Sequence, residues 1–245
     1  MLDSSFQKAT QILRGCRRLA VLTGAGVSAE SGLATFRGTG GLWRGRDAMS
    51  LATPEAFAAD PWLVWSFYNE RRRLAFEAEP NAGHRALAAM QEHFELELIT
   101  QNVDGLHARA GSRDVIELHG RLSITRCTTC AEERDRPGEV LPELPTCDVC
   151  GGLMRPGVVW FGEGLPEEAT TRAAVAASRC QAMLVVGTSR VVYPAAGYAE
   201  VAADAGAHVI EINPNSVGRP GETTIREASA TALPRLWDAV SKLRA

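Results

Sequence analysis

Residues 19–38, with the sequence LAVLTGAGVSAESGLATFRG, pass from an apolar run into closely spaced glycines. Gly24 and Gly26 would let the backbone approach an anion closely, and the N–H groups of a following helix would point at it. The third glycine, Gly32, comes later than in the G-x-G-x-x-G pattern of many dehydrogenases. We therefore expect a dinucleotide phosphate site, serving a chemistry that need not be hydride transfer.

Polar residues follow a later apolar run, in the sequence ITQNVDGLHARAG. Because ligands of open parallel sheets bind beyond the carboxyl ends of the strands, Gln101, Asn102 and Asp104 are candidates for a ligand site. The alternative is that Asn102 or Asp104 only caps the helix that follows. Three polar groups at one strand end, in a chain that also has a phosphate-type loop, favour the ligand role.

A histidine, His119, lies at another strand end in the sequence VIELHGRL, eight residues before the first of four clustered cysteines. An imidazole with an ordinary pKa of about 6.5 can take a proton at neutral pH, and a cleft between two domains is where such a base is useful. The alternative is a structural histidine. His107 is expected to pack or cap, and His84, His93 and His208 receive no role.

Four of the six cysteines form two C-x2-C pairs separated by sixteen residues: Cys127, Cys130, Cys147 and Cys150. Two thiolates in a tight turn can share one ion, and two such turns make a closed four-sulfur zinc site with no open position for a reacting water. Two disulfides, the alternative, fit poorly with a chain that shows no secretion signal. We predict one structural Zn²⁺, and we expect Cys16 and Cys180 to be small buried hydrophobes.

Short apolar runs alternate with helical patterns along the chain. The runs are residues 19–23, 96–100, 115–118, 183–186 and 209–212, and the helical patterns include residues 167–178 and 194–205. This alternation predicts a parallel sheet covered by helices on both faces. The expected fold class is α/β: a doubly wound, Rossmann-like sheet with an inserted small zinc-binding domain and a helical excursion that starts as a flap.

Two segments interrupt this alternation. Residues 122–156 carry charges, prolines and the four cysteines, and we expect them to form the zinc-binding module. Because apolar strands resume at Val158, we expect the chain to re-enter the main sheet there. Residues 38–79 begin glycine-rich, as a covering loop, and continue into a helix from about Pro61. The Rossmann-like domain would then comprise residues 1–37, 80–121 and 157–245.

The chain has 245 residues and a net charge of −3, with acids and bases interspersed. Residues 121–156 offer neither a basic surface nor an aromatic stacking platform, which disfavours a zinc-ribbon module that binds nucleic acid. No apolar run approaches the roughly 20 residues of a membrane helix, and the N-terminus lacks the pattern of a signal peptide. We expect a cytoplasmic protein without membrane or direct nucleic-acid partners, and no pattern indicates its oligomeric state.

Seven separated elements, spread over nearly the whole chain, resemble in their order the sirtuin family of NAD-dependent protein deacylases. They are GAGVSAESG, TFRG, QNVDGLH, ELHG, the two C-x2-C pairs, GTS at 187–189 and INPN at 212–215. The TFRG sequence and the pair Tyr68 and Arg71 are similar to the class III branch, which contains bacterial CobB-type enzymes.

The resemblance implies NAD as a cosubstrate and indicates its contacts. Residues 24–43 would hold the pyrophosphate and cover the nicotinamide ribose, residues 101–104 would line the nicotinamide pocket, and the loops at 187–189 and 213–215 would contact the adenosine. The implied NAD-binding residues are Gly24, Ala25, Gly26, Ser28, Thr35, Phe36, Arg37, Trp43, Gln101, Asn102, Val103, Asp104, Gly187, Thr188, Ser189, Asn213, Pro214, Asn215 and Ser229.

The resemblance also implies the reaction. The acyl-lysine oxygen attacks the ribose carbon as nicotinamide leaves, His119 removes a proton through the ribose hydroxyls, and water finally releases lysine and 2'-O-acyl-ADP-ribose. His119 and Asn102 would be the catalytic residues, with Asn102 addressing the ribose and its water. Zinc would only hold the small domain together. Transfer of ADP-ribose to a protein side chain on the same scaffold is an alternative.

The 3.6-residue period places Tyr68 and Arg71 on one stripe of the helical sequence PWLVWSFYNERRRLAFEA. A phenol and a guanidinium one turn apart can grip a carboxylate. In the class III branch the matching pair reads the acid end of succinyl-, malonyl- or glutaryl-lysine. Ala52 falls where that branch has a small residue that makes room for the longer acyl chain.

Three arginines follow one another in this helix, and only Arg71 shares the stripe of the phenol. Arg72 and Arg73 point elsewhere and are expected to be ordinary solvated charges. If the stripe does not bind a carboxylate, Arg71 would instead form an ion pair with an acid such as Glu70 or Glu77, and the phenol would only pack.

The resemblance implies that an acyl-lysine protein or peptide binds as an extended strand between the sequence VWFGE and the segment after GTS. Because such main-chain pairing reads little side-chain sequence, no target protein is predicted. Beyond the three acyl-pocket residues, the implied substrate-binding residues are Val159, Phe161, Gly162, Glu163 and Val192.

Overall fold

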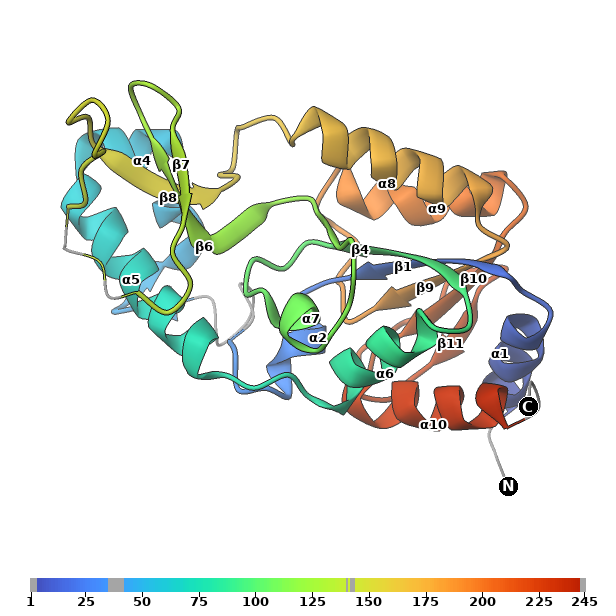
Figure 1. Cartoon of the computed structure of the whole chain (residues 1–245). Helices are drawn as coiled ribbons and strands as arrows, with labels where there is room; N and C mark the ends of the chain where they lie inside the picture. The colour runs from blue at the N-terminus through green and yellow to red at the C-terminus, as the bar shows by residue number, and fades with distance from the viewer. Residues whose placement is uncertain (1–3, 35–41, 140, 142–143, 243–245) are drawn as a thin grey trace.

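The structure is a computed structural model and describes residues 4–34, 42–139, 141 and 144–242 (Figure 1). Its main sheet has six parallel strands in the order β11-β10-β9-β1-β4-β5. Their bounds are β1 Arg18–Thr23, β4 Glu95–Thr100, β5 Ile116–Glu117, β9 Ala182–Val186, β10 His208–Ile212 and β11 Thr223–Ile225. The predicted α/β fold with a parallel sheet is confirmed.

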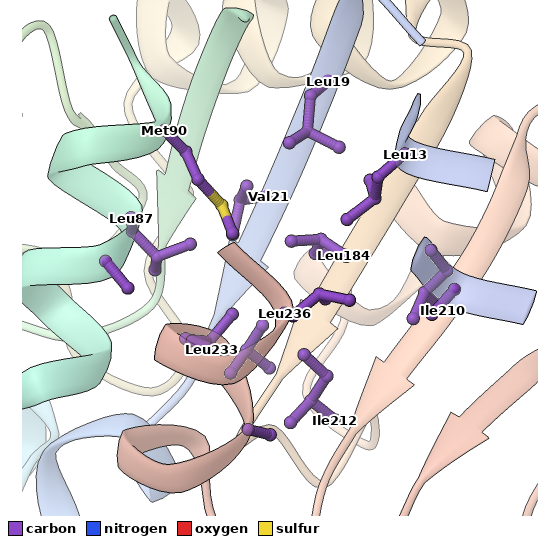
Figure 2. Packing of buried hydrophobic residues seen from close by; sticks show 14 of the residues in the cluster. Leu13, Leu19, Val21, Leu87, Met90, Leu184, Ile210, Ile212, Leu233 and Leu236 are labelled. Atoms are coloured by element: carbon purple, nitrogen blue, oxygen red, sulfur yellow. The ribbon is translucent and has the colours of Figure 1, made fainter. Parts of the chain in front are cut away.

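Helices cover both faces of the main sheet, which explains why its central strands are continuously apolar. Val21 of β1 lies on one face, with Leu87 and Leu233 from two of the covering helices (Figure 2). The next residue, Leu22, packs on the other face with Ala177. The first face carries α1 Ser4–Arg14, α6 Ala82–Met90 and α10 Ser229–Ser241, and the second carries α8 Glu167–Arg179 and α9 Tyr198–Asp204.

A three-stranded antiparallel sheet lies apart from the main sheet, with the order β7-β6-β8. Its strands are β6 Gly120–Cys127, β7 Glu133–Asp135 and β8 Met154–Val158. Val158 ends β8 and pairs antiparallel with Gly120, so the prediction that the chain re-enters the main sheet at this residue is wrong. The apolar residues of β8 alternate in burial, as suits a small sheet with one covered face, and the main sheet resumes only at β9.

The segment before α6 packs against the small sheet as short elements and one long helix. Thr53 and Asp60 cap two of these helices, because their side chains accept hydrogen bonds from the N–H groups of Ala56 and Leu63 at 3.1 and 2.9 Å, and a proline follows each cap. The bounds are β2 Leu42–Trp43, β3 Arg46–Asp47, α3 Ala48–Leu51, α4 Pro54–Ala59 and α5 Pro61–Glu77. The helix predicted from about Pro61 is therefore confirmed.

Three short helices follow strands of the main sheet, near the site described below. They are α2 Gly26–Ala29, α7 Leu106–Arg109 and the 3-10 helix Ala195–Gly197. Among the helices of the described residues, none combines the length and the apolar character of a membrane span.

Candidate functional site

A cleft of about 700 Å³ is lined by the residues that follow β1, β4, β9 and β10, and by residues of α5, β6 and β8. It therefore lies beyond the carboxyl ends of the parallel strands, where ligands of such sheets bind. The cleft brings together these sequence-predicted residues: Gly24, Ala25, Gly26, Ser28, Ala52, Tyr68, Arg71, Gln101, Asn102, Val103, Asp104, His119, Val159, Phe161, Gly162, Glu163, Gly187, Thr188, Ser189, Val192, Asn213 and Asn215.

Three predicted NAD-binding residues lie outside the lining of the cleft: Trp43, Pro214 and Ser229. The indole nitrogen of Trp43 donates to Glu70 at 2.8 Å, and its ring packs edge-on against Phe67 in the core beside the small sheet. Ser229 is buried at the start of α10. Three more predictions, Thr35, Phe36 and Arg37, fall outside the described residues. Roles for these six residues remain predictions.

The glycines after β1 allow two loops to touch. A Cβ at Gly26 would lie 2.7 Å from the carbonyl oxygen of Gly187, and a Cβ at Gly24 would lie 2.8 Å from Cβ of Thr188. The N–H of Gly26 donates to that Gly187 oxygen at 2.8 Å. The missing side chains of these glycines therefore leave room for the loop after β9, which the sequence did not indicate, and their approach to an anion stays a prediction.

Replacing Gly26 with alanine is expected to lower the free energy of unfolding by about 1–3 kcal/mol, the usual cost of overpacking, because the neighbouring atoms are backbone. Gly164→Ala is the matched control, since its Cβ would meet no atom within 4 Å and its φ is not positive. Urea unfolding of both variants tests this. Equal stability of the two variants would contradict the close loop contact.

Ser28, Asn102 and Asp104 form a hydrogen-bonded group at the centre of the cleft. The Ser28 hydroxyl donates to Asp104 Oδ2 at 2.8 Å, and the Asn102 amide donates to Ser28 Oγ at 3.2 Å and to the Gly24 carbonyl at 3.1 Å. Asp104 Oδ1 accepts from the N–H of Leu106 at 2.9 Å. Gly105, not Asp104, is the N-cap of α7, but Asp104 both accepts the N–H of the first helical residue and lines the cleft. Burial raises the pKa of its carboxyl.

Two buried histidines pack beside the hydrogen-bonded group of Ser28, Asn102 and Asp104. His107 Nε2 is 2.9 Å from Thr23 Oγ1, and its ring centroid is 4.8 Å from that of His84. His84 Nε2 lies 3.4 Å from Ser28 Oγ, while its Nδ1 accepts from the N–H of Asn81 in a capping box. Burial lowers the pKa of His84 to about 4 and that of His107 to about 3, so both rings are neutral at pH 7. The predicted packing of His107 is confirmed. The position of His84 was not predicted.

The ring of His119 is oriented by a backbone carbonyl. Its Nδ1 lies 2.9 Å from the carbonyl oxygen of Gln101, an atom that only accepts hydrogen bonds, so Nδ1 carries the proton in the neutral ring. Nε2 is then the basic nitrogen. Burial lowers the pKa of His119, and the hydrogen bond to the Gln101 carbonyl opposes this shift. Because the net shift is downward, the base is unprotonated at neutral pH. The geometry suits a general base.

Tyr68 and Arg71 share one wall of the cleft, with Ala52 also in its lining. Tyr68 is only 2% exposed, and burial raises its pKa to about 12. Burial lowers the pKa of the Arg71 guanidinium, which the charges of Tyr68 and Asp104 oppose, and its Cζ lies 5.5 Å from the ring centroid of Phe67. A buried phenol and guanidinium in a cleft wall can bind a carboxylate.

The glutamates considered as alternative partners of Arg71 have other partners. Glu70 accepts from the Trp43 indole at 2.8 Å, and Glu77 pairs with Arg73 at 2.7 Å on the exposed side of α5. The prediction that Arg73 is a solvated charge is confirmed.

The prediction that Arg72 is a solvated charge is wrong. It is 2% exposed rather than solvated, and its guanidinium donates to the carbonyl oxygens of Leu122 and Arg136, to the latter at 2.9 Å. A buried guanidinium needs such acceptors, and here they belong to the small sheet and the chain beyond it. Arg72 therefore fixes α5, the helix that carries Tyr68 and Arg71, against the zinc-binding module.

Some backbone N–H groups of the predicted peptide-binding segment already form hydrogen bonds within the chain. The N–H of Val159 donates to the His119 carbonyl and that of Phe161 to the Ala52 carbonyl, each at 2.9 Å. The N–H groups of Gly162 and Val192 have no acceptor among the described backbone atoms. Pairing with a peptide would therefore involve these two N–H groups and the carbonyls of Val159 and Phe161.

The four clustered cysteines converge at the end of the small sheet. Their Sγ atoms all lie within 4.8 Å of one another, with Cys127 and Cys150 at 3.5 Å and Cys130 and Cys147 at 3.7 Å. Zn–S bonds of about 2.3 Å separate the sulfurs of a tetrahedron by about 3.8 Å, so the donor set fits a four-thiolate zinc ion. None of these cysteines lines the cleft, which agrees with a structural metal.

Removal of zinc is expected to unfold the small sheet. So small a unit has little hydrophobic core, and the bound ion supplies much of its stability. Cys147→Ala should lose most bound metal by atomic absorption and lower the melting temperature. Cys180→Ala is the control, because that cysteine is buried beside α8, far from the cluster in the fold. Full zinc content in the Cys147 variant would contradict the assignment.

Comparison with known proteins gives one consistent result. A model of the Sir2 family matches residues 24–194. An NAD-dependent protein deacylase of Aquifex aeolicus is 50% identical over 224 residues, which cover 90% of this chain and 94% of that protein. An NAD-dependent protein deacylase of Pseudomonas aeruginosa is 50% identical over 238 residues, which cover 92% and 95% of the two chains.

Solved structures agree in fold. A complex of a Sir2 homologue with NAD superposes with a TM-score of 0.92 at 42% identity, covering 100% of this chain and 96% of that one. A Sir2 complex with a p53 peptide and NAD has a TM-score of 0.86 at 30% identity, covering 99% and 100% of the two chains.

Proposed function

This chain belongs to the Sir2 family, and we propose that it acts as an NAD-dependent deacylase of lysine side chains in proteins. We propose further that it removes succinyl and malonyl groups as well as acetyl groups. The observation that carries the proposal is His119, a neutral imidazole that is oriented by the Gln101 carbonyl and lines a cleft beyond the strand ends.

The residues of the cleft fit NAD as the cosubstrate. Among residues 24–28, Ala25 alone has an N–H without a described hydrogen-bond acceptor, and a phosphate oxygen would supply one. The amide of Asn213 donates to the Thr188 carbonyl at 3.1 Å, which joins the two loops proposed to contact the adenosine. NAD supplies the electrophilic ribose carbon of the reaction.

The other groups of the cleft would position the substrates and remove a proton. His119 Nε2 would take a proton from a ribose hydroxyl, and the Gln101 carbonyl, by holding Nδ1–H, would stabilise the imidazolium that results. Asn102, fixed by Gly24 and Ser28, would orient the ribose and its water. Asp104 would address the nicotinamide carboxamide.

Tyr68 and Arg71 support the proposal for acidic acyl groups. Both are buried in the cleft wall, and both offer donors to an anion at the far end of the acyl chain. Acetyl-lysine has no acceptor at that end of the acyl chain. An acyl group that ends in a carboxylate would accept hydrogen bonds from both side chains, and it should therefore bind more tightly.

Incubation with adenine-labelled NAD and an acyl-lysine peptide tests the reaction class. Deacylation is expected to convert the label into soluble acyl-ADP-ribose, in an amount equal to the lysine peptide released. Label attached to protein would indicate the alternative, an ADP-ribosyltransferase. Peptide hydrolysis with NAD intact would contradict both.

A further inference from the structure

The Tyr68 hydroxyl oxygen accepts a hydrogen bond within the protein. The indole nitrogen of Trp160 lies 3.0 Å from the Tyr68 hydroxyl oxygen, in a buried contact. An indole N–H only donates, so the phenol oxygen is the acceptor in this bond. Among the described residues, Trp160 is the one hydrogen-bond partner of the phenol. The phenol proton remains to be donated to another acceptor.

Trp160 is itself held firmly in place. The Arg155 guanidinium stacks on its ring, with Cζ 3.5 Å from the ring centroid, and pairs with both carboxylate oxygens of Glu163 at 2.6 and 2.9 Å. Glu163 also accepts the backbone N–H of Trp160 at 2.8 Å. The ring of Phe57 packs at 5.2 Å. These contacts hold the indole N–H in position to donate to the Tyr68 hydroxyl oxygen.

The neighbour of the phenol inside the cleft is Arg71, which is also a donor without acceptor capacity. Without the indole N–H, the phenol oxygen would be open to another donor of the cleft wall. With the indole in place, one lone pair of the phenol oxygen is already occupied. The phenol O–H then remains available to a ligand in the cleft.

We propose that Trp160 is a positioning residue for acyl selectivity, which makes Tyr68 a donor to an acyl group ending in a carboxylate. This inference rests on the proposed function and adds the residue that sets the polarity of the pocket. Burial, which raises the pKa of Tyr68 to about 12, keeps the phenol protonated over the pH range of an assay. A phenol fixed as a donor favours an anion over a neutral acyl end of equal length.

Trp160→Phe keeps an aromatic ring and removes only the indole N–H. Steady-state kinetics with succinyl- and butyryl-lysine peptides compare a charged and a neutral chain of the same length. The ratio of kcat/KM for succinyl to butyryl is expected to fall about tenfold, mainly through KM for the succinyl peptide, as befits a weakened hydrogen bond to a carboxylate.

Trp65→Phe is the matched control. This tryptophan also lies in the core beside the small sheet, and its indole donates to the Met154 carbonyl at 2.8 Å, but it does not line the cleft. Its loss should lower stability and leave the succinyl to butyryl ratio within about twofold of the parent, because a lost structural bond does not discriminate between acyl ends.

An unchanged ratio in Trp160→Phe, or the same shift in Trp65→Phe, would overturn the role of Trp160. If Trp160→Phe does not fold, Arg155→Met decides instead, because it keeps the indole N–H but removes the stacked cation; a smaller shift of the ratio in the same direction is expected, and none would overturn the proposal. Failure of the proposed function is distinguishable, since the parent enzyme would then show no preference for the succinyl peptide.

Discussion

Substitution of His119 by tyrosine is expected to lower NAD-dependent deacylation by about 10²–10⁴-fold, the contribution of a general base. The physical reason is the loss of Nε2, the basic nitrogen that the Gln101 carbonyl fixes by accepting Nδ1–H. Initial rates with an acyl-lysine peptide measure the effect, and circular dichroism checks that the fold is retained.

His208→Tyr is the matched control for this substitution. His208 is exposed at the start of β10 and does not line the cleft, so its replacement should leave the rate unchanged. Product formation by a folded His119 variant at the parental rate would remove the proposed base.

The same base sets the acid limb of the pH profile. Its neutral form is the active one, so kcat/KM should fall as the pH drops through the pKa of His119. Burial lowers this pKa from its ordinary value of 6.5, and the limb is therefore expected below pH 6.5. A limb above pH 6.5 would contradict a buried neutral base.

Arg71→Met is expected to lower the ratio of kcat/KM for succinyl- to acetyl-lysine peptides by about 100-fold, as for the loss of one partner of a buried charge pair. Methionine keeps much of the apolar stem and removes the guanidinium. Kinetics with the two peptides measure the ratio. Acetyl turnover should gain relative to succinyl turnover, since the pocket wall becomes apolar.

Arg73→Met provides the control on the same helix. Arg73 pairs with Glu77 on the exposed side of α5, so its loss should leave the ratio unchanged. If the Arg71 variant keeps the succinyl to acetyl ratio of the parent, the carboxylate-binding role of Arg71 is wrong and the acyl pocket reads something other than charge.

The main sheet was predictable because its central strands are buried on both faces. Residues 19–22 and 183–186 are continuously apolar, and both runs fall within strands of the structure. β11 was not predicted, since its three residues, Thr223–Ile225, include two threonines and form no apolar run. Val158 was assigned to the wrong sheet because an apolar run does not tell which sheet completes its pairing.

The cleft residues that belong to a sequence motif were predictable. Residues whose surroundings depend on a partner distant in sequence were less predictable. Helical period alone gives no sign that the carbonyls of Leu122 and Arg136 lie beside Arg72 and satisfy it in the core. The loop that touches Gly24 and Gly26 is likewise distant in sequence. For His84, the one available signal was its position three residues after Asn81, which fits a capping box.

A crystal structure with NAD and a succinyl-lysine peptide would show whether His119 faces the ribose. We expect a hydroxyl of the nicotinamide ribose within hydrogen-bond distance of His119 Nε2, and the succinyl carboxylate between Tyr68 and Arg71. A dinucleotide bound away from His119, or an imidazole turned away from the ribose, would contradict it.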